Sequence, residues 1–408
     1  MYRLLAGLRV IELSAFIAAP LCGNTLAQFG AEVIRIDPIG GGLDQARSPL
    51  NSSGQSLYWA GLNYAKRSVS LDLTSDEGRR LVRALIAAPH PGGGIVSSNL
   101  TYGWLAYEKL RELRPDLIML SIEGHVDGRS AVDYTVNAET GLPFLTGPAD
   151  TSNPVNHVLP AWDIATGLYG ALALVSAERQ RKLSGEGCEI RLSLADIAYA
   201  LLATLGFTSE LEVTGHERVA DGNSIYGSFG RDFATADGRK IMIVAITDGQ
   251  WKRLLDVTKL SETMDAAARS HGLNFNIEQD RYAGRDAIAA SLEKWVGGHT
   301  LAEVENRFAG TGICWGSFRS LSEVVKSDQR FATGLNPVFV RRQHEGYGTF
   351  TLPGAAVRLG NQEREPLPEA PTLGKDTAFV LRTMLGLSND TIRDLQARGI
   401  AGGMPFDG

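Results

Sequence analysis

The 408-residue sequence is poor in cysteine and has no long hydrophobic run, and both shortages narrow the possible function classes. Its three cysteines, Cys22, Cys188 and Cys314, stand far apart, without a CxxC pair. This usage fits a reducing, cytoplasmic setting and does not support a zinc site. No uncharged apolar run reaches the roughly 20 residues of a membrane span, and the first residues lack the apolar segment of a signal peptide. We therefore expect a cytoplasmic protein with no membrane contact.

Concentrated positive charge is also missing. The formal net charge is -6, and Lys and Arg occur together only in short pairs such as Lys66-Arg67 and Arg79-Arg80. A nucleic-acid partner is therefore not expected. The hydrophobic fraction of 44% and the charged fraction of 21% are those of an ordinary globular protein. The length favours two or three domains.

Two common catalytic signatures are absent. The seven histidines form no HExxH motif and no pair three or four residues apart, which speaks against a metal site. No GxSxG motif occurs, which disfavours a serine hydrolase.

The first 124 residues alternate between short apolar runs and helical patterns. Strands are predicted at 8–13, 32–37, 68–73, 93–99 and 116–124, and helices at 20–30, 75–89 (with Ser75 as N-cap) and 107–113. Such alternation predicts the α/β class, with a doubly wound, Rossmann-like open parallel sheet. Ligands of these sheets bind outside the carboxyl ends of the strands.

The remaining residues change in character along the chain. A long buried helix is predicted from Asp163 to about residue 181, followed by a strand and a helix over 188–207. The polar stretch 208–224 is predicted to be a linker, and 233–247 a hairpin around Asp237-Gly238. Helices are expected over 249–335, β-structure from 336, then a Pro-rich strap and a helical tail.

The glycine-rich stretch IGGGLD (39–44) follows a predicted strand and invites comparison with a phosphate-binding loop. Its spacing is neither GxGxxG nor GxxxxGK[ST], so a surface loop is the better interpretation. Asp37, at the end of the strand, occupies the place of a ribose-binding acid, but the preceding turn lacks the glycine fingerprint.

Asp163, in LPAWDIATG (159–167), is the strongest candidate for chemistry. An aspartate that precedes a helical pattern is a good N-cap, and many such residues do nothing more. The helix dipole is also expected to keep this carboxylate ionised, which suits covalent catalysis at an acyl group. His157, six residues earlier, is a candidate to line the same site.

Motifs along the whole chain resemble those of the family III CoA-transferases, the CaiB/BaiF group. They include LAGLRVIELSAFIAAP, LAQFGAEVIRIDPIGGG, LNYAKRSVSLDLTSDEGRRLV, LSGEGCEIRLSLADIA and the closing APTLGKDTAFVLRTMLGL. Within the family, VDYTVNAETGLPFLTG and NHVLPAWDIATG look closest to members that move CoA between the two carboxyl groups of one C5 unsaturated dicarboxylic acid.

The resemblance implies that Asp163 is the nucleophile. Its carboxylate would attack the thioester carbonyl to give an aspartyl anhydride, while the CoA thiolate stays bound. A carboxylate then attacks the anhydride, and the thiolate attacks the new acyl carbon. Coenzyme A is part of the substrate, so no cofactor is expected. Exclusion of water preserves the activated acyl group.

The resemblance also implies contacts with CoA and substrate at the ends of the sheet. The matching positions are Ile17, Ala18, Arg47, Tyr58, Leu71, Thr74, Asn99 and Leu100. Three departures from the family weaken individual contacts: SSNLTYG (97–103) replaces the usual aromatic and Arg contacts, Pro38 replaces an Arg, and Ile17 replaces a Gln. Ile17 predicts a less polar pocket that suits a methyl-bearing acyl chain.

The resemblance implies a large domain built from residues 1–207 and 336–408, a smaller α+β domain over 225–335, and an interlocked homodimer. Three alternatives remain open from the residues themselves. They are an intermolecular CoA-transferase that uses two separate acids, a Rossmann-type nucleotide-binding protein in which Asp163 is a cap, and an acyl-CoA sensor.

Overall fold

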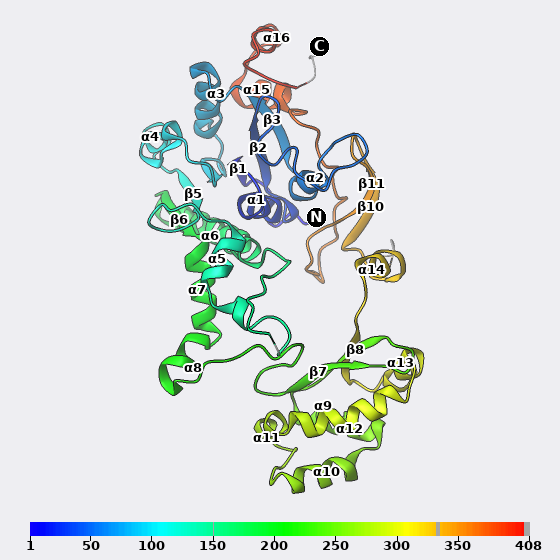
Figure 1. Cartoon of the computed structure of the whole chain (residues 1–408). Helices are drawn as coiled ribbons and strands as arrows, with labels where there is room; N and C mark the ends of the chain where they lie inside the picture. Colours follow the sequence, from blue (N-terminus) through cyan, green and yellow to red (C-terminus); the bar gives the residue numbers. More distant parts are fainter. Residues whose placement is uncertain (150, 332–334, 404–408) are drawn as a thin grey trace. The chain divides into compact units, whose positions relative to one another are not determined.

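The computed structural model describes residues 1–149, 151–331 and 335–403, which form two compact units (Figure 1). The large unit comprises Met1–Thr140, His157–Gly215 and the residues from Gln329 onward. The small unit comprises Gly141–Asn156 and His216–Asp328. The segment predicted as a linker begins inside helix α8 (Phe207–Thr214), and the predicted domain limits themselves stay a prediction.

A six-stranded parallel sheet organises the large unit and confirms the predicted fold class. Its order is β3-β2-β1-β4-β5-β6, the order of a Rossmann sheet. The strands are β1 (Arg9–Leu13), β2 (Glu32–Pro38), β3 (Arg67–Leu71), β4 (Ile95–Ser98), β5 (Ile118–Glu123) and β6 (Cys188–Ser193). In the middle of the sheet, Ile11 pairs with Ile34 on one side and Val96 on the other. The order of the strands reverses between β1 and β4. Sheets of this kind form a ligand-binding crevice at that point, at the carboxyl ends of the strands.

The helices of the large unit are α1 (Ala18–Gln28), α2 (Leu57–Asn63), α3 (Asp76–Ala87), α4 (Tyr107–Leu113), α5 (Asp133–Glu139), α6 (Ala161–Ser184), α7 (Leu194–Thr204), α8, α15 (Thr377–Leu385) and α16 (Asn389–Ala397), with a single 3₁₀ turn at Gly103–Leu105. The predicted helices follow the strands in the predicted order, while α2, α5 and α8 were not predicted. Ser75 caps α3 as predicted, since its hydroxyl accepts the N–H of Gly78.

The C-terminal segment returns to the large unit. The Asp376 carboxylate accepts the N–H of Ser68 at 2.9 Å, and the N–H of Gly402 donates to the carbonyl of Ser70. Leu381 and Leu395 of the tail helices join the apolar core with Leu71 of β3. The hairpin β10 (Phe339–His344) and β11 (Gly348–Pro353) belongs to the same unit.

The opposite face of the sheet is covered by α1 and α6, which pack closely against each other. Two glycines allow α6 to pack closely, Gly167 against α1 and Gly170 against strand β5 of the sheet. A Cβ on Gly167 would lie 2.7 Å from the carbonyl oxygen of Ala18, and one on Gly170 would lie 3.0 Å from Leu120.

The small unit has an antiparallel sheet of β7 (Phe229–Ala234), β8 (Lys240–Ala245) and β9 (Cys314–Ser317). Gly238, with φ +73°, makes the predicted hairpin turn between β7 and β8. Its helices are α9 (Asp248–Thr258), α10 (Ser261–Ser270), α11 (Glu278–Ala283), α12 (Arg285–Gly297), α13 (Leu301–Phe308) and α14 (Leu321–Ser327), with a 3₁₀ turn at Leu142–Phe144. The prediction of helices alone over 249–335 is wrong at β9, because a four-residue strand has no alternating pattern long enough to detect.

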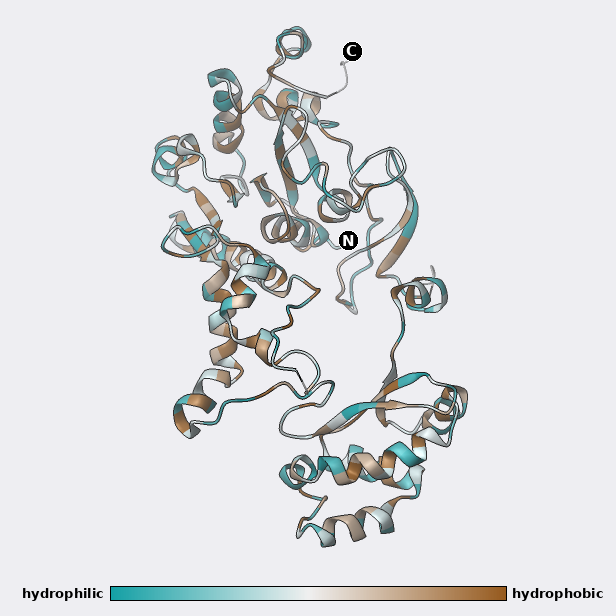
Figure 2. Cartoon of the chain, in the orientation of Figure 1, coloured by the Kyte–Doolittle hydropathy of each residue, from teal (hydrophilic) through white to brown (hydrophobic). Residues whose placement is uncertain are grey.

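The prediction that α6 is a buried helix holds for only one of its faces. Tyr169 and Leu172 are 56% and 62% exposed, and Leu168 is also exposed. Apolar side chains continue over α7 and α8, where Leu205 is 68% and Val213 is 83% exposed. Figure 2 shows much of α7 and α8 in the hydrophobic colour. Among the described residues, no single helix has the length and apolarity to cross a membrane, and α7 and α8 pass such a test only as a pair bent by 56°.

Replacing Gly167 by Ala is expected to lower the free energy of unfolding by about 1–3 kcal/mol, because the added methyl group meets the backbone of α1. Gly61, inside α2, has no atom within 4 Å of the equivalent position. Gly61→Ala is therefore the matched control, with unchanged or slightly higher stability. Urea unfolding followed by circular dichroism measures both variants. Equal midpoints for Gly167→Ala and the wild type would contradict the close packing.

Candidate active site

Asp163 lies in the first turn of α6 but does not cap it. The N-cap position is occupied by Pro160, and Asp163 is the third residue of the helix, so the predicted capping role is wrong. The first amides of α6 are instead satisfied by a carboxylate from another helix. One oxygen of Asp133 accepts the N–H of Trp162 at 2.7 Å and the N–H of Asp163 at 3.0 Å. These are donors that a helix start leaves without intrahelical partners.

Helix α5 holds the start of α6 at a second point. Asn137, one turn after Asp133, accepts the indole N–H of Trp162 at 3.0 Å. The other oxygen of Asp133 bonds to Nε2 of His157. The ring of His157 contacts Tyr134 edge-on and lies beside Trp162. His157 therefore reaches the site, as anticipated, through Asp133 rather than by direct contact with Asp163.

The loop after β1 forms another wall of the site. Phe16 has φ 65°, a left-handed conformation that is unusual for an aromatic residue. Its N–H donates to Asp44 at 3.1 Å. The side-chain amide of Asn99, just after β4, bonds to both the N–H and the carbonyl of Ala15. Two different segments thus hold this loop in its strained shape.

The glycine-rich stretch 39–44 supports this loop rather than a phosphate. Its last residue, Asp44, is fully buried and pairs with Arg35 at 2.9 Å. The same guanidinium binds Asp37 at 2.9 Å, and both partners are almost completely buried. Asp37 is therefore buried in an ion pair with Arg35, and its carboxylate is not exposed where it could bind a ribose.

Arg47 and Tyr58 approach Asp163 from the loop after β2 and from α2. The Arg47 guanidinium lies 5.5 Å from the Phe16 ring centre and 5.3 Å from that of Tyr58. Burial raises the pKa of the Tyr58 hydroxyl, Arg47 opposes this, and Asp163 adds to it. The Tyr58 oxygen is buried and has no hydrogen-bond partner among the described residues.

The environment of Asp163 disfavours its charge. Burial and the nearby Asp133 raise the pKa of the Asp163 carboxyl to about 7, and Arg47 only partly opposes them. The expectation that the helix dipole keeps Asp163 ionised is therefore wrong, because desolvation and a like charge outweigh it. A carboxylate of this basicity is a better nucleophile at neutral pH than an exposed one.

Asp163 borders a cavity of about 550 Å³ at the carboxyl ends of the strands. Ala18, Asn99 and Leu100 line it, as do His125 and Arg129. A second cavity of about 380 Å³ shares a wall with the first, formed by Asn99, Leu100, Thr101, Ile122 and Glu123. Together they make a polar and apolar cleft beside the candidate nucleophile.

Other predicted site residues lie outside the cavity wall. Ile17 is half-buried at the start of α1. Leu71 is fully buried in the core, and Thr74 bonds to Asp72. Contact of any of the predicted residues with CoA stays a prediction.

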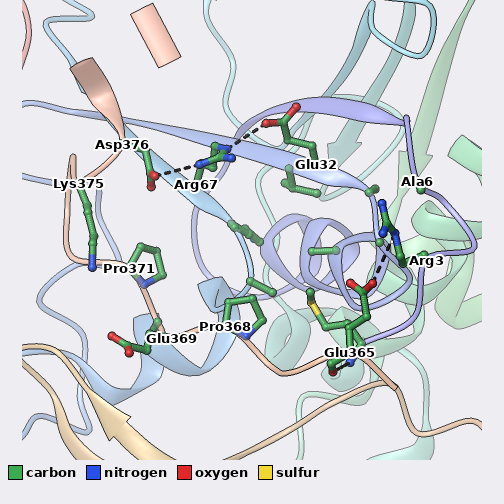
Figure 3. A pocket seen from close by; sticks show the side chains of 18 of the residues that line it. Arg3, Ala6, Glu32, Arg67, Glu365, Pro368, Glu369, Pro371, Lys375 and Asp376 are labelled. Atoms are coloured by element: carbon green, nitrogen blue, oxygen red, sulfur yellow. Dashed lines mark hydrogen bonds and ion pairs between the residues drawn. The ribbon is translucent and has the colours of Figure 1, made fainter. Parts of the chain in front are cut away.

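A further cavity, of about 800 Å³, lies at the opposite edge of the sheet (Figure 3). Its charges are paired, since Arg67 bonds to Glu32 and Asp376 and Arg3 faces Glu365. This cavity lies at the amino ends of β2 and β3, whereas Rossmann sheets bind ligands at the carboxyl ends of their strands. No group of three or more potential metal ligands occurs in the described part of the chain.

Sequence reasoning missed Asp133 and Asn137. Their four-residue spacing places both on one face of a helix, but nothing local shows that this face meets the start of α6. Phe16 and Asp44 were missed for the same reason.

The family model described as CoA-transferase family III matches residues 5–377. The chain is 45% identical over 402 residues to 2-methylfumaryl-CoA isomerase of Chloroflexus aurantiacus, covering 98% of each chain. It is 29% identical to succinyl-CoA:mesaconate CoA-transferase of Haloarcula marismortui, covering 71% of this chain and 74% of that one. A CaiB/BaiF family structure from Brucella suis superposes with TM-score 0.75 at 26% identity, covering 93% and 99% of the two chains.

The raised pKa of Asp163 predicts a pH-dependent cost in stability. The folded chain holds this proton more tightly than the unfolded chain, whose aspartates titrate near about 3.9. The stability from this group is therefore complete below about pH 4 and is lost as the pH rises through about 7. Asp163→Asn stays uncharged, so its urea midpoint should rise relative to the wild type across this range.

Asp196→Asn is the matched control for this measurement. Asp196 is also the third residue of its helix, α7, but it is exposed. This variant reports the effect of removing an exposed carboxyl at the same helix position. An Asp163→Asn midpoint that differs from the wild type by the same amount at every pH would contradict the desolvation of Asp163.

Proposed function

The chain belongs to CoA-transferase family III, and we propose that it moves CoA between the two carboxyl groups of one C5 unsaturated dicarboxylic acid, as in 2-methylfumaryl-CoA. The observation that carries this proposal is Asp163, a carboxyl of raised pKa at the wall of a cleft at the carboxyl ends of the sheet. The 45% identity to 2-methylfumaryl-CoA isomerase over 98% of both chains supports the substrate class.

In the first step, an oxygen of ionised Asp163 attacks the thioester carbonyl carbon. A C–O bond forms, the C–S bond breaks, and the products are a mixed anhydride and the CoA thiolate. The acyl group stays activated as long as water is excluded.

In the second half of the cycle, the other carboxyl group must reach the same carbon of Asp163. The two carboxyl groups of a trans-configured diacid point in opposite directions, so the acid must turn while activation is kept. The proposed cycle therefore departs at this step from the one that the resemblance implies, in which a carboxylate attacks the anhydride. Thiolate attack on Asp163 Cγ would instead free the diacid and leave an aspartyl thioester. The second carboxylate then displaces the thiolate, which attacks the new acyl carbon and regenerates Asp163. A diacid that never leaves the site keeps a high effective concentration.

Two neighbours of Asp163 suit the charges of this reaction. The unpartnered hydroxyl of Tyr58 is a donor for the oxyanion that forms on the attacked carbonyl. Arg47, held against the Tyr58 and Phe16 rings, is a cation for the carboxylate that the diacid leaves free.

The neighbouring cavities account for the rest of the substrate. Ala18, Asn99 and Leu100 border the cleft beside Asp163, which suits the pantetheine arm of CoA. Ile17, Leu71 and Thr74 remain proposed contacts on the strength of the family resemblance. Coenzyme A enters as part of the substrate, so the proposed reaction requires no resident cofactor or metal.

Transfer between two separate acids is the second candidate, because the Haloarcula relative is named for such a reaction. The nucleotide-binding alternative has lost its support, since Asp37 and Asp44 are occupied by Arg35.

We also propose that the chain forms a homodimer. The exposed apolar side chains of α6, α7 and α8 support this, because a face of this kind is characteristic of an interface.

Asp163→Asn is expected to reduce turnover by on the order of 10³-fold or more, because a carboxamide cannot form the anhydride. Asp196→Asn, at the same helix position of α7, is expected to keep wild-type turnover. Wild-type enzyme quenched with hydroxylamine during turnover should carry a hydroxamate on the peptide that contains residue 163, as seen by mass spectrometry. Full activity of Asp163→Asn would overturn the proposed nucleophile.

Purified 2-methylfumaryl-CoA, supplied alone, is expected to convert to the isomer with CoA on the other carboxyl group. When isotopically labelled free diacid is added, the product should contain no label, because the acid turns without leaving the site. Absolute dependence on added acid would instead establish the intermolecular reaction.

A further inference from the structure

The Asp133 carboxylate joins three segments around the start of α6. One oxygen accepts the amides of Trp162 and Asp163, and the other bonds to His157. Asp133 itself is only 1% exposed. A buried carboxylate is therefore bonded to the backbone amide of the candidate nucleophile, Asp163.

An ionised Asp133 opposes the ionisation of Asp163. The two amides that bind Asp133 stabilise its own charge, but they provide nothing to the side chain of Asp163. The negative charge of Asp133 is one of the causes that raise the pKa of the Asp163 carboxyl, because like charges repel strongly inside a protein. A cation paired with Asp133 therefore offsets this repulsion and makes it easier for Asp163 to lose its proton.

His157 is that cation when it is protonated. Within the described residues, its imidazole forms an ion pair with Asp133. The rings of Tyr134 and Trp162, centred 5.8 Å and 6.2 Å away, flank the imidazole. This packing directs Nε2 toward Asp133.

The other charged and titratable groups around the site face Asp163 or have partners other than Asp133 and His157. Arg47 and Tyr58 face Asp163 directly, and His125 on the cavity wall lies 3.8 Å from Glu139 of α5. Glu123 and Arg129 line the same cavity, where Glu123 pairs with Arg191 and Arg129 with Asp127.

We propose that Asp133 and His157 are positioning residues for Asp163. Asp133 holds the first turn of α6 through the two amides, and His157 pairs with the Asp133 carboxylate and balances its charge beside Asp163. This inference rests on the proposed role of Asp163 as the nucleophile.

The test is the pH dependence of kcat/KM, whose acid limb reports ionisation of the nucleophile in the free enzyme. His157→Gln removes the balancing charge but keeps a polar side chain. Its acid limb should move to higher pH by about one unit or more, with activity recovering at high pH. His271→Gln, at an exposed histidine after α10, is the control and should leave the limb in place.

Asp133→Asn should move the limb the opposite way, to lower pH. The like charge is gone, while the oxygen of the introduced carboxamide still accepts the two amides. The double variant Asp133→Asn with His157→Gln should match Asp133→Asn, because His157 acts through the charge of Asp133. Thermal unfolding and circular dichroism establish that each variant is folded.

A uniform loss of activity in His157→Gln, with an unmoved acid limb, would overturn the inference and leave a purely structural contact. The inference would also be overturned if the acid limb of Asp133→Asn moves to higher pH or stays in place. This second result decides between the two outcomes even if His157→Gln fails to fold. If Asp163→Asn retains full activity, the proposed function fails first. If Asp163→Asn is inactive while both limbs stay in place, only the inference about Asp133 and His157 fails.

Discussion

The site depends on two carboxylates that share the first turn of one helix. Asp133 occupies the amides at the start of α6, and Asp163 projects from the same turn. Because the helix start is already neutralised by Asp133, its dipole offers little to Asp163, which is also desolvated. The consequence is a carboxyl whose pKa is raised to about 7, which suits the proposed role of Asp163 as a nucleophile toward an acyl group.

The surrounding fold keeps this arrangement rigid. Gly167 lets α6 lie directly on the backbone of α1, one turn after Asp163. Asn99 holds the strained loop after β1 through Ala15. The buried pair of Arg35 with Asp44 holds the same loop at Phe16. Contacts from three segments thus fix the loop after β1 and the start of α6, which carries the candidate nucleophile.

Periodicity predicted most elements of the large unit, because parallel strands and amphipathic helices are local patterns. Helix α4 and the cap at Ser75 were found without error. Strand β9 escaped detection because four residues carry too little pattern. The exposed apolar face of α6 was mistaken for core, since composition alone does not distinguish burial within a chain from an uncovered surface.

The sequence by itself determined the fold class, the family resemblance and the choice of Asp163 as the candidate reactive residue, because these depend on motifs that are contiguous in the chain. Only the tertiary structure decided how Asp163 behaves. Asp133 and His157 lie 30 and six residues away in the chain, and only folding brings their charges to the start of α6. A carboxyl pKa is set by desolvation and neighbouring charges in space, and no local pattern in the sequence encodes either of them.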